Sequence, residues 1–246
     1  MKKRRAVIGV IFFLLPLTHT FLNQTGVDLY SSRLTPSMPE KVKTKGQIKK
    51  QGKVKTDLQV KTEEESALFY YNRGVDKQNA GDNSGAIADY TKVIEIDPKF
   101  ANAYNNRAIL YEDLGDSYGA ISDLSNAIKI EPKDAIAYYN RGFSKGTLKD
   151  YAGEISDYTK AIEIDPKYKN AYYNRGLSKN LLEDYSGAIA DYTKAVEIDP
   201  IYADAYLNRG VTKEIIGDLK GACSDWRQAL FLTPNDDVAN WVKDQC

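Results

Sequence analysis

The chain has 246 residues, 28% of them charged, and its 34 Lys and Arg balance its 34 Asp and Glu. It holds one His and two Cys; His19 lies near the amino terminus, so the rest of the chain has no His for a catalytic triad or a metal site, or to activate a Cys. We therefore expect no enzyme, no metal and no cofactor.

Residues 1–22 have the pattern of an export signal or an amino-terminal membrane anchor. The basic residues Lys2–Arg5 precede the apolar run Ala6–Leu17. A helix of this length spans about 18 Å, less than the roughly 30 Å hydrocarbon layer, which favours an export signal. The usual small-x-small cleavage site is missing, so an uncleaved anchor stays open. In both cases we expect the remaining chain to be exported or tethered at a membrane.

Residues 23–61 are expected to form a basic, disordered linker, because they contain few apolar residues and no periodicity. Residues 1–61 hold 13 Lys or Arg against 3 Asp or Glu, whereas residues 62–246 hold 21 against 31. The Lys-rich stretch 41–61 could attract anionic lipid or nucleic acid. It has no interleaved aromatic residues to stack bases, so nucleic acid is not favoured. A solubilising spacer and a lipid-binding tail remain the alternatives.

The folded region is expected to begin at Thr62. The stretch Thr62–Glu65 fits a capping box, in which Thr62 caps a helix and Glu65 returns to it.

Five copies of a 34-residue unit follow, and they span 67–100, 101–134, 135–168, 169–202 and 203–236. Within each copy, two runs of apolar residues recur at steps of three and four, as in amphipathic helices. An Asp and a Gly lie between the runs, and a Pro ends the second one. Each copy is therefore predicted to be an antiparallel helix pair, with residues facing each other where their repeat positions sum to about 31.

This pattern resembles the tetratricopeptide repeat, which has large residues at positions 4, 11 and 24, small ones at 8, 20 and 27, and Pro at 32. Position 4 is Tyr in all five copies, position 8 is Gly or Ala, and position 24 is Tyr, Leu or Trp. The resemblance covers about 170 residues of the chain. It implies an all-α fold, a right-handed α-solenoid of five helix-turn-helix hairpins.

Two positions depart from that family pattern. Position 7, usually Leu in the family, is Arg in every copy, and position 23 is always Asp. Because 7 and 23 should face each other, we expect five ion pairs rather than independent solvated charges. The pairs are Arg73–Asp89, Arg107–Asp123, Arg141–Asp157, Arg175–Asp191 and Arg209–Asp225. Position 11 is Lys in four copies, and we expect its stem to pack while its ammonium group reaches water.

In the resembled family, positions 2, 5, 6, 9, 12 and 13 of the first helices line a concave groove. Position 6 supplies a column of Asn side chains, which either hold the backbone of an extended peptide or stay hydrated. Position 5 adds aromatic contact area. The expected groove residues are Asn72, Asn106, Asn140, Asn174, Asn208, Tyr71, Asn105, Tyr139 and Tyr173. No Lys or Arg occupies positions 2, 5 or 6, so a clamp for a terminal carboxylate is not expected.

Residues 237–246 are expected to form a short capping helix, because the last repeat has no neighbour to cover it. Cys223 and Cys246 should reach similar heights on adjacent helices, which in an exported protein permits a disulfide. The alternative is that Cys223 is a buried, inert replacement for Ile.

The sequence thus favours a non-enzymatic scaffold, exported or membrane-tethered, that binds an uncharged or mildly basic extended segment of another protein. No small-molecule substrate is expected. The alternative is a membrane-associated assembly factor that its Lys-rich tail places on anionic lipid.

Overall fold

A computed structural model describes residues 57–234, 239, 242–244 and 246. Every regular element in these residues is a helix. The helices are α3 (Asp57–Asn79), α4 (Asn83–Ile96), α5 (Ala101–Asp113), α6 (Ser117–Ile130), α7 (Ala135–Thr147), α8 (Tyr151–Ile164), α9 (Lys169–Leu181), α10 (Tyr185–Ile198), α11 (Ala203–Ile215) and α12 (Leu219–Leu232).

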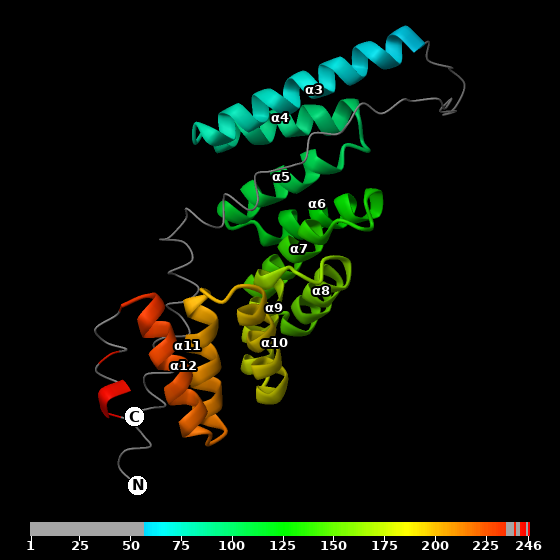
Figure 1. Cartoon of the computed structure of the whole chain (residues 1–246). Coiled ribbons are helices and arrows are strands. Elements are labelled where there is room, and N and C mark those ends of the chain that lie inside the picture. The colour runs from blue at the N-terminus through cyan, green and yellow to red at the C-terminus, as the bar shows by residue number, and fades with distance from the viewer. Residues whose placement is uncertain (1–56, 235–238, 240–241, 245) are drawn as a thin grey trace. The chain divides into compact units, whose positions relative to one another are not determined.

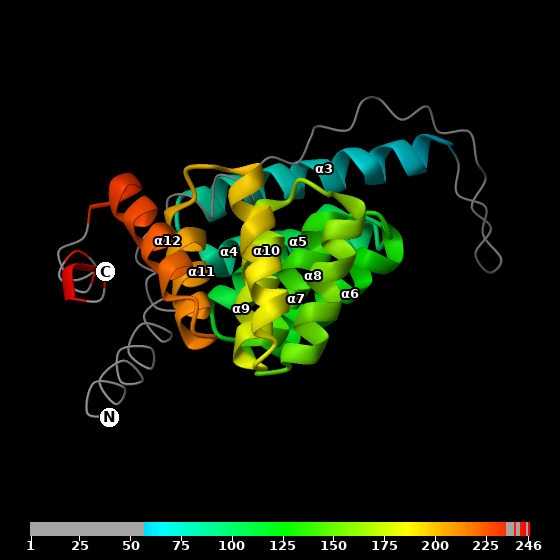
Figure 2. The same cartoon turned by 60° about the horizontal axis from the view of Figure 1, so that its bottom comes forward.

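The helices pack as consecutive antiparallel hairpins, α3 with α4 through α11 with α12, and each hairpin contacts the next (Figure 1). This is the α-solenoid expected from the sequence. Beyond the hairpins, the first helices of neighbouring repeats also touch, α5 with α7 and α9 with α11. Figure 2 shows the same stack from a second side. Side-chain hydrogen bonds join the other two neighbouring pairs, from Asn106 of α5 to Tyr71 of α3 and from Asn174 of α9 to Tyr139 of α7, so the first helices form a wall of their own.

The turn between the two helices of a repeat is fixed by its Asp. Asp184, for example, precedes α10, and its carboxylate accepts a hydrogen bond from the Gly187 backbone N–H at 3.0 Å. The equivalent Asp caps the second helix of every other repeat. Such a cap contributes about 1 kcal/mol. Each second helix then ends just before the Asp-Pro, Glu-Pro or Thr-Pro pair, as expected.

The core is a series of small clusters, one between the helices of each hairpin and its neighbour. The pairing of positions 8 and 24 explains its density. A Cβ placed on Gly176 would lie 2.7 Å from the ring of Tyr192, so only a residue without a side chain fits there. Gly142 meets Tyr158 and Gly210 meets Trp226 in the same way. The predicted facing of large and small residues across each hairpin is present.

The amino-terminal boundary differs from the prediction. Helix α3 begins at Asp57, so Thr62 lies inside the helix and the predicted capping box is wrong. The Thr62 carbonyl instead accepts a hydrogen bond from Ser66 Oγ one turn later, at 2.8 Å. The predicted linker 23–61 therefore overlaps the helix at its end, and its first part lies outside the described residues, as does the predicted signal or anchor 1–22.

At the carboxyl end, the structure joins Cys223 and Cys246 in a disulfide. Of the predicted capping helix 237–246, the structure describes Ala239, 242–244 and Cys246, and all of these except Cys246 are helical. Val242 is buried in one cluster with Cys223 and Trp226. The described part of this segment thus covers the end of the last repeat and is crosslinked to it. No helix in the part of the chain that the structure describes is long and apolar enough to cross a membrane.

Candidate functional site

The first helices carry the side chains predicted to line a groove, and their charge pattern is one-sided. Positions 2, 5, 6, 9, 12 and 13 contain no Lys or Arg in any repeat. The charged residues at these positions are acidic: Glu112, Asp113, Asp204 and Glu214. Burial raises the pKa of Asp204 and of Glu214 above the ordinary carboxylate range. A wall with this pattern disfavours an acidic ligand and favours a neutral or basic one.

The predicted Asn column is only partly available to a ligand. Asn174 Nδ2 donates to the hydroxyl of Tyr139 in the preceding repeat at 2.8 Å, and Asn208 Nδ2 donates to Tyr173 at 2.9 Å. Asn106 Nδ2 reaches Tyr71 in the same way, at 3.2 Å. Positions 5 and 6, expected to contact a ligand independently, are therefore bonded to each other across three repeat boundaries.

Asn72, Asn105 and Asn140 behave differently. Asn72 belongs to the first repeat and is exposed. Asn105 stands where three other repeats have Tyr, and its Nδ2 donates to Asp134 Oδ2 at 2.7 Å. Asn140 is 6% exposed, and neither its Nδ2 nor its Oδ1 has a hydrogen-bond partner. The column is thus interrupted at the boundary between repeats 2 and 3.

All five predicted Arg–Asp pairs are present. In repeat 4, Arg175 Nε and Nη2 donate to the two carboxylate oxygens of Asp191 at 2.9 and 2.6 Å. Arg175 Nη1 also donates to the hydroxyl of Thr159 in the preceding repeat, at 3.0 Å. The equivalent pairs in the other repeats have the same bidentate geometry. The Arg residues therefore hold hairpins together and, from repeat 2 onward, join each hairpin to the one before it.

The expectation for Lys at position 11 was wrong. Lys179 Nζ lies 2.8 Å from Asp191 Oδ2, and the Lys of repeats 1, 3 and 5 contacts its own Asp in the same way. Its ammonium group therefore shares the carboxylate with Arg rather than extending into water.

Glu154 is a residue whose importance the sequence interpretation missed. Position 20 is Ala in the other four repeats, and Glu154 is 8% exposed on α8. A Cβ on Gly146 of α7 would lie 2.6 Å from the Glu154 carboxyl carbon, so the Gly makes room for it. Burial raises the pKa of Glu154 to about 7, although the neighbouring Ser178 and Tyr158 lower it in part. The signal available in the sequence was that repeat 3 alone combines Gly at position 12 with Glu at position 20.

The residue at position 12 also determines whether the hydroxyl of the buried Tyr at position 24 has a hydrogen-bond partner. In repeat 1, the Tyr90 hydroxyl donates to Gln78 Oε1 at 2.8 Å. In repeat 4 the shorter Asn180 takes the place of Gln, and both Asn180 Oδ1 and the Tyr192 hydroxyl are buried without partners. The repeats thus differ in how well this core position is satisfied.

Asn180→Gln is expected to raise the free energy of unfolding by about 1 kcal/mol, because the longer side chain can accept the Tyr192 hydroxyl as Gln78 accepts Tyr90. Urea denaturation of the variant and the native chain measures the difference. The control is Asn180→Gln combined with Tyr192→Phe, in which no hydroxyl is present and the gain should disappear. An equal gain in both backgrounds would contradict the explanation.

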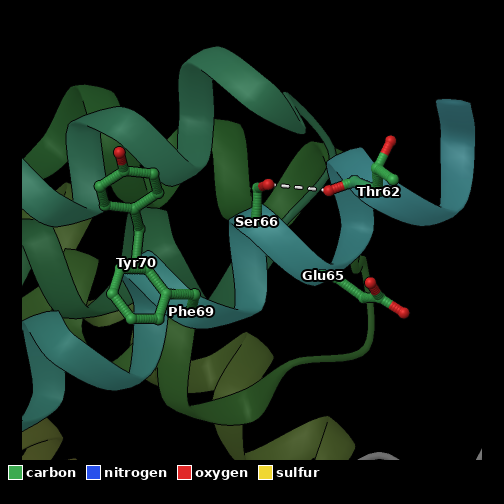
Figure 3. Close-up of a pocket in the computed structure, with 5 residues that line it drawn as sticks. All are labelled: Thr62, Glu65, Ser66, Phe69 and Tyr70. Carbon is green, nitrogen blue, oxygen red and sulfur yellow. Dashed lines mark hydrogen bonds between the residues drawn. The ribbon is translucent and has the colours of Figure 1, made fainter.

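An open hollow of ≈ 390 Å³ lies along α3 and is lined by Thr62, Glu65, Ser66, Phe69 and Tyr70 (Figure 3). Phe69 is exposed, whereas the equivalent Ala of every later repeat is buried against the repeat before it. The hollow therefore lies on the face of the first repeat that corresponds to the stacking face of the later repeats. Within the described residues, no group of three or more His, Cys, Asp or Glu could hold a metal ion.

Two family models match the chain. A model described as "TPR repeat" matches residues 79–115 and 180–214, and one described as "Tetratricopeptide repeat" matches residues 101–134 and 135–168. Both describe a repeat and neither describes a catalytic domain. No curated protein matches the chain.

Solved structures with the same fold include the MamA protein, which is 28% identical, with 68% of this chain and 92% of that chain covered and a TM-score of 0.64. YrrB, described as "a TPR protein with an unusual peptide-binding site", is 21% identical, with 75% and 95% covered and a TM-score of 0.64. PilF of Pseudomonas aeruginosa is 16% identical, with 75% and 87% covered and a TM-score of 0.65. The last two likenesses concern the fold alone.

Proposed function

The chain belongs to the tetratricopeptide repeat family. We propose that it is a non-enzymatic scaffold that binds an extended segment of a partner protein along its first-helix wall, the surface formed by positions 2, 5, 6, 9, 12 and 13 of the first helices. The family fold is suited to protein–protein interaction, and YrrB, a structure of the same fold, is described as having a peptide-binding site.

The observation that carries the proposal is the composition of this wall. Its charged side chains are all acidic, and position 9 adds a strip of Val75, Ile109, Phe143, Leu177 and Val211, each buried or half-buried. An extended segment with alternating apolar and basic side chains would match both features. The segment is therefore neutral or mildly basic.

Selection of displayed random peptides on the immobilised full chain tests the proposal. Enriched peptides should carry more Lys and Arg than Asp and Glu, and added salt should weaken their binding. Phe143→Ser on the wall should weaken the binding of an enriched peptide about 10-fold, an estimate for the loss of one buried aromatic contact. Lys160→Ser, at an exposed side chain of α8, is the control. The absence of any enriched peptide, or equal effects of both substitutions, would contradict the proposal.

We further propose that residues 1–22 export the chain or anchor it in a membrane. The basic start and the apolar run support this placement. Fractionation of source cells, with the mass of the mature chain, distinguishes a cleaved signal from an anchor. Recovery of the full-length chain from the cytosol would contradict both. Binding of a peptide of residues 41–61 to anionic vesicles would instead support the lipid-binding tail.

A further inference from the structure

The bonds between positions 5 and 6 define a regular ladder along the first-helix wall. At three boundaries an Asn amide nitrogen is held by the Tyr hydroxyl of the preceding repeat. An amide nitrogen engaged in this way has one donor fewer for a ligand. At these three steps one N–H of the amide is therefore already used within the protein.

The boundary between repeats 2 and 3 is the one break among these described steps. Asn105 takes the place of the Tyr and directs its own amide nitrogen to Asp134. Asn105 Oδ1, Asn140 Nδ2 and Asn140 Oδ1 are then all buried without a partner. Burying a polar group without a partner destabilises the unbound chain. Among the side chains at positions 5 and 6 of the described repeats, such atoms lie at this boundary alone.

The break involves more than one residue of repeat 2. Repeats 1, 3 and 4 each place three aromatic rings together at positions 5, 24 and 34; in repeat 4 these are Tyr173, Tyr192 and Tyr202. Repeat 2 has Asn105, Leu124 and Asp134 at these positions. The whole aromatic group has therefore been replaced, and the replacements at positions 5 and 34 are polar and bonded to each other.

We propose that this break is a recognition site for a peptide group, in which the Asn140 amide and Asn105 Oδ1 bond the backbone of the bound segment. The inference rests on the proposed function and specifies where along the wall the segment is recognised.

The chemistry of the free groups favours this ligand. A primary amide presents N–H donors and a carbonyl acceptor side by side, which match the C=O and N–H of an extended backbone. Asn105 Oδ1 supplies a further acceptor for an N–H group. Asn140 is covered in the unbound chain, so rotation of its side chain accompanies binding. Hydrogen bonds to the partner's backbone then satisfy polar atoms that have no partner in the unbound chain, and this gain favours the complex.

The variant Asn105→Tyr tests the inference, because it supplies the hydroxyl that the other three steps have. With an enriched peptide from the selection above as the probe, we expect Asn105→Tyr to raise the melting temperature of the full chain and to weaken peptide binding at least 10-fold. Asn140→Ala should also weaken binding about 10-fold, and it serves as the second variant if the Tyr ring does not fit. Asn174→Ala is the matched comparison at the same position of the next repeat: its amide nitrogen already donates to Tyr139, so the substitution should weaken binding much less than Asn140→Ala does, whereas stability should fall.

The outcomes separate the two proposals. If a peptide binds the native chain and neither Asn105→Tyr nor Asn140→Ala alters its affinity, the break holds only buried water and the inference fails, whereas the scaffold function stands. If Asn174→Ala weakens binding as much as Asn140→Ala, the Asn side chains of different repeats contribute equally to binding and the inference also fails. If no peptide is enriched, the scaffold function fails and the inference fails with it.

Discussion

Asp191→Ala is expected to lower the free energy of unfolding by about 3–5 kcal/mol, the range measured when one partner of a buried ion pair is removed. Asp191 is 3% exposed and neutralises both Arg175 and Lys179. Without the carboxylate, two cations face each other beside the Tyr192 core, and Arg175 keeps the Thr159 hydroxyl and the Tyr172 ring as partners. Urea denaturation followed by circular dichroism measures the loss.

Two matched variants separate the charge from the packing. Lys179→Met should cost less than about 1 kcal/mol, because repeat 2 has Tyr111 at the same position and forms its Arg–Asp pair without a Lys. Arg175→Leu combined with Asp191→Ala should recover much of the loss, since Leu removes the unpaired guanidinium. If Asp191→Ala changes stability by less than about 1 kcal/mol, the pair is no more than a solvated surface contact.

Stability is expected to depend on pH through Glu154. The folded-state pKa, about 7, lies above the ordinary Glu value, so the folded state binds the proton more tightly than the unfolded state does. The stabilisation is complete at low pH and is lost as the pH rises through about 7. From pH 5 to pH 8 this one group should lower the free energy of unfolding by about 2–3 kcal/mol.

Glu154→Gln isolates this contribution, because it keeps the shape of the side chain and cannot titrate. The difference between the native and Gln chains should change by about 2–3 kcal/mol between pH 5 and pH 8. Glu131, Asp204 and Glu214 also have raised pKa values and cancel in that difference. The double variant Glu154→Ala with Gly146→Gln has the Gln and the Ala that repeat 1 carries at positions 12 and 20. Its stability should lack this pH dependence in the same way. A pH-independent difference would show that Glu154 has an ordinary pKa when folded.

The 34-residue period predicted the hairpins. The rule that facing residues have repeat positions summing to about 31 was sufficient to predict which residues pair within each hairpin. Arg175 and Asp191 occupy positions that sum to 30, and this arithmetic placed them together without any structure. The rule works because two antiparallel helices of fixed pitch bring the same positions together in every copy. It failed for Thr62, which precedes the first repeat and therefore has no equivalent position in another copy.

The candidate site was harder to predict because it depends on contacts between repeats. The sequence gives Asn140 and Asn174 the same position, and nothing within one repeat distinguishes them. They differ because Asn174 follows a repeat with Tyr139 whereas Asn140 follows one with Asn105. Glu154 was missed for a related reason: its pKa follows from burial between three helices, and helix periodicity carries no information on that burial.

Photocrosslinking from single positions tests the central claim most directly. Benzoylphenylalanine is placed at position 143 of the first-helix wall or at position 160 of the second-helix surface, and each chain is irradiated with a bound, selected peptide. The account predicts a covalent adduct from position 143 and none from position 160. An adduct from position 160 alone, at a peptide concentration that saturates binding, would show that the segment binds outside the wall.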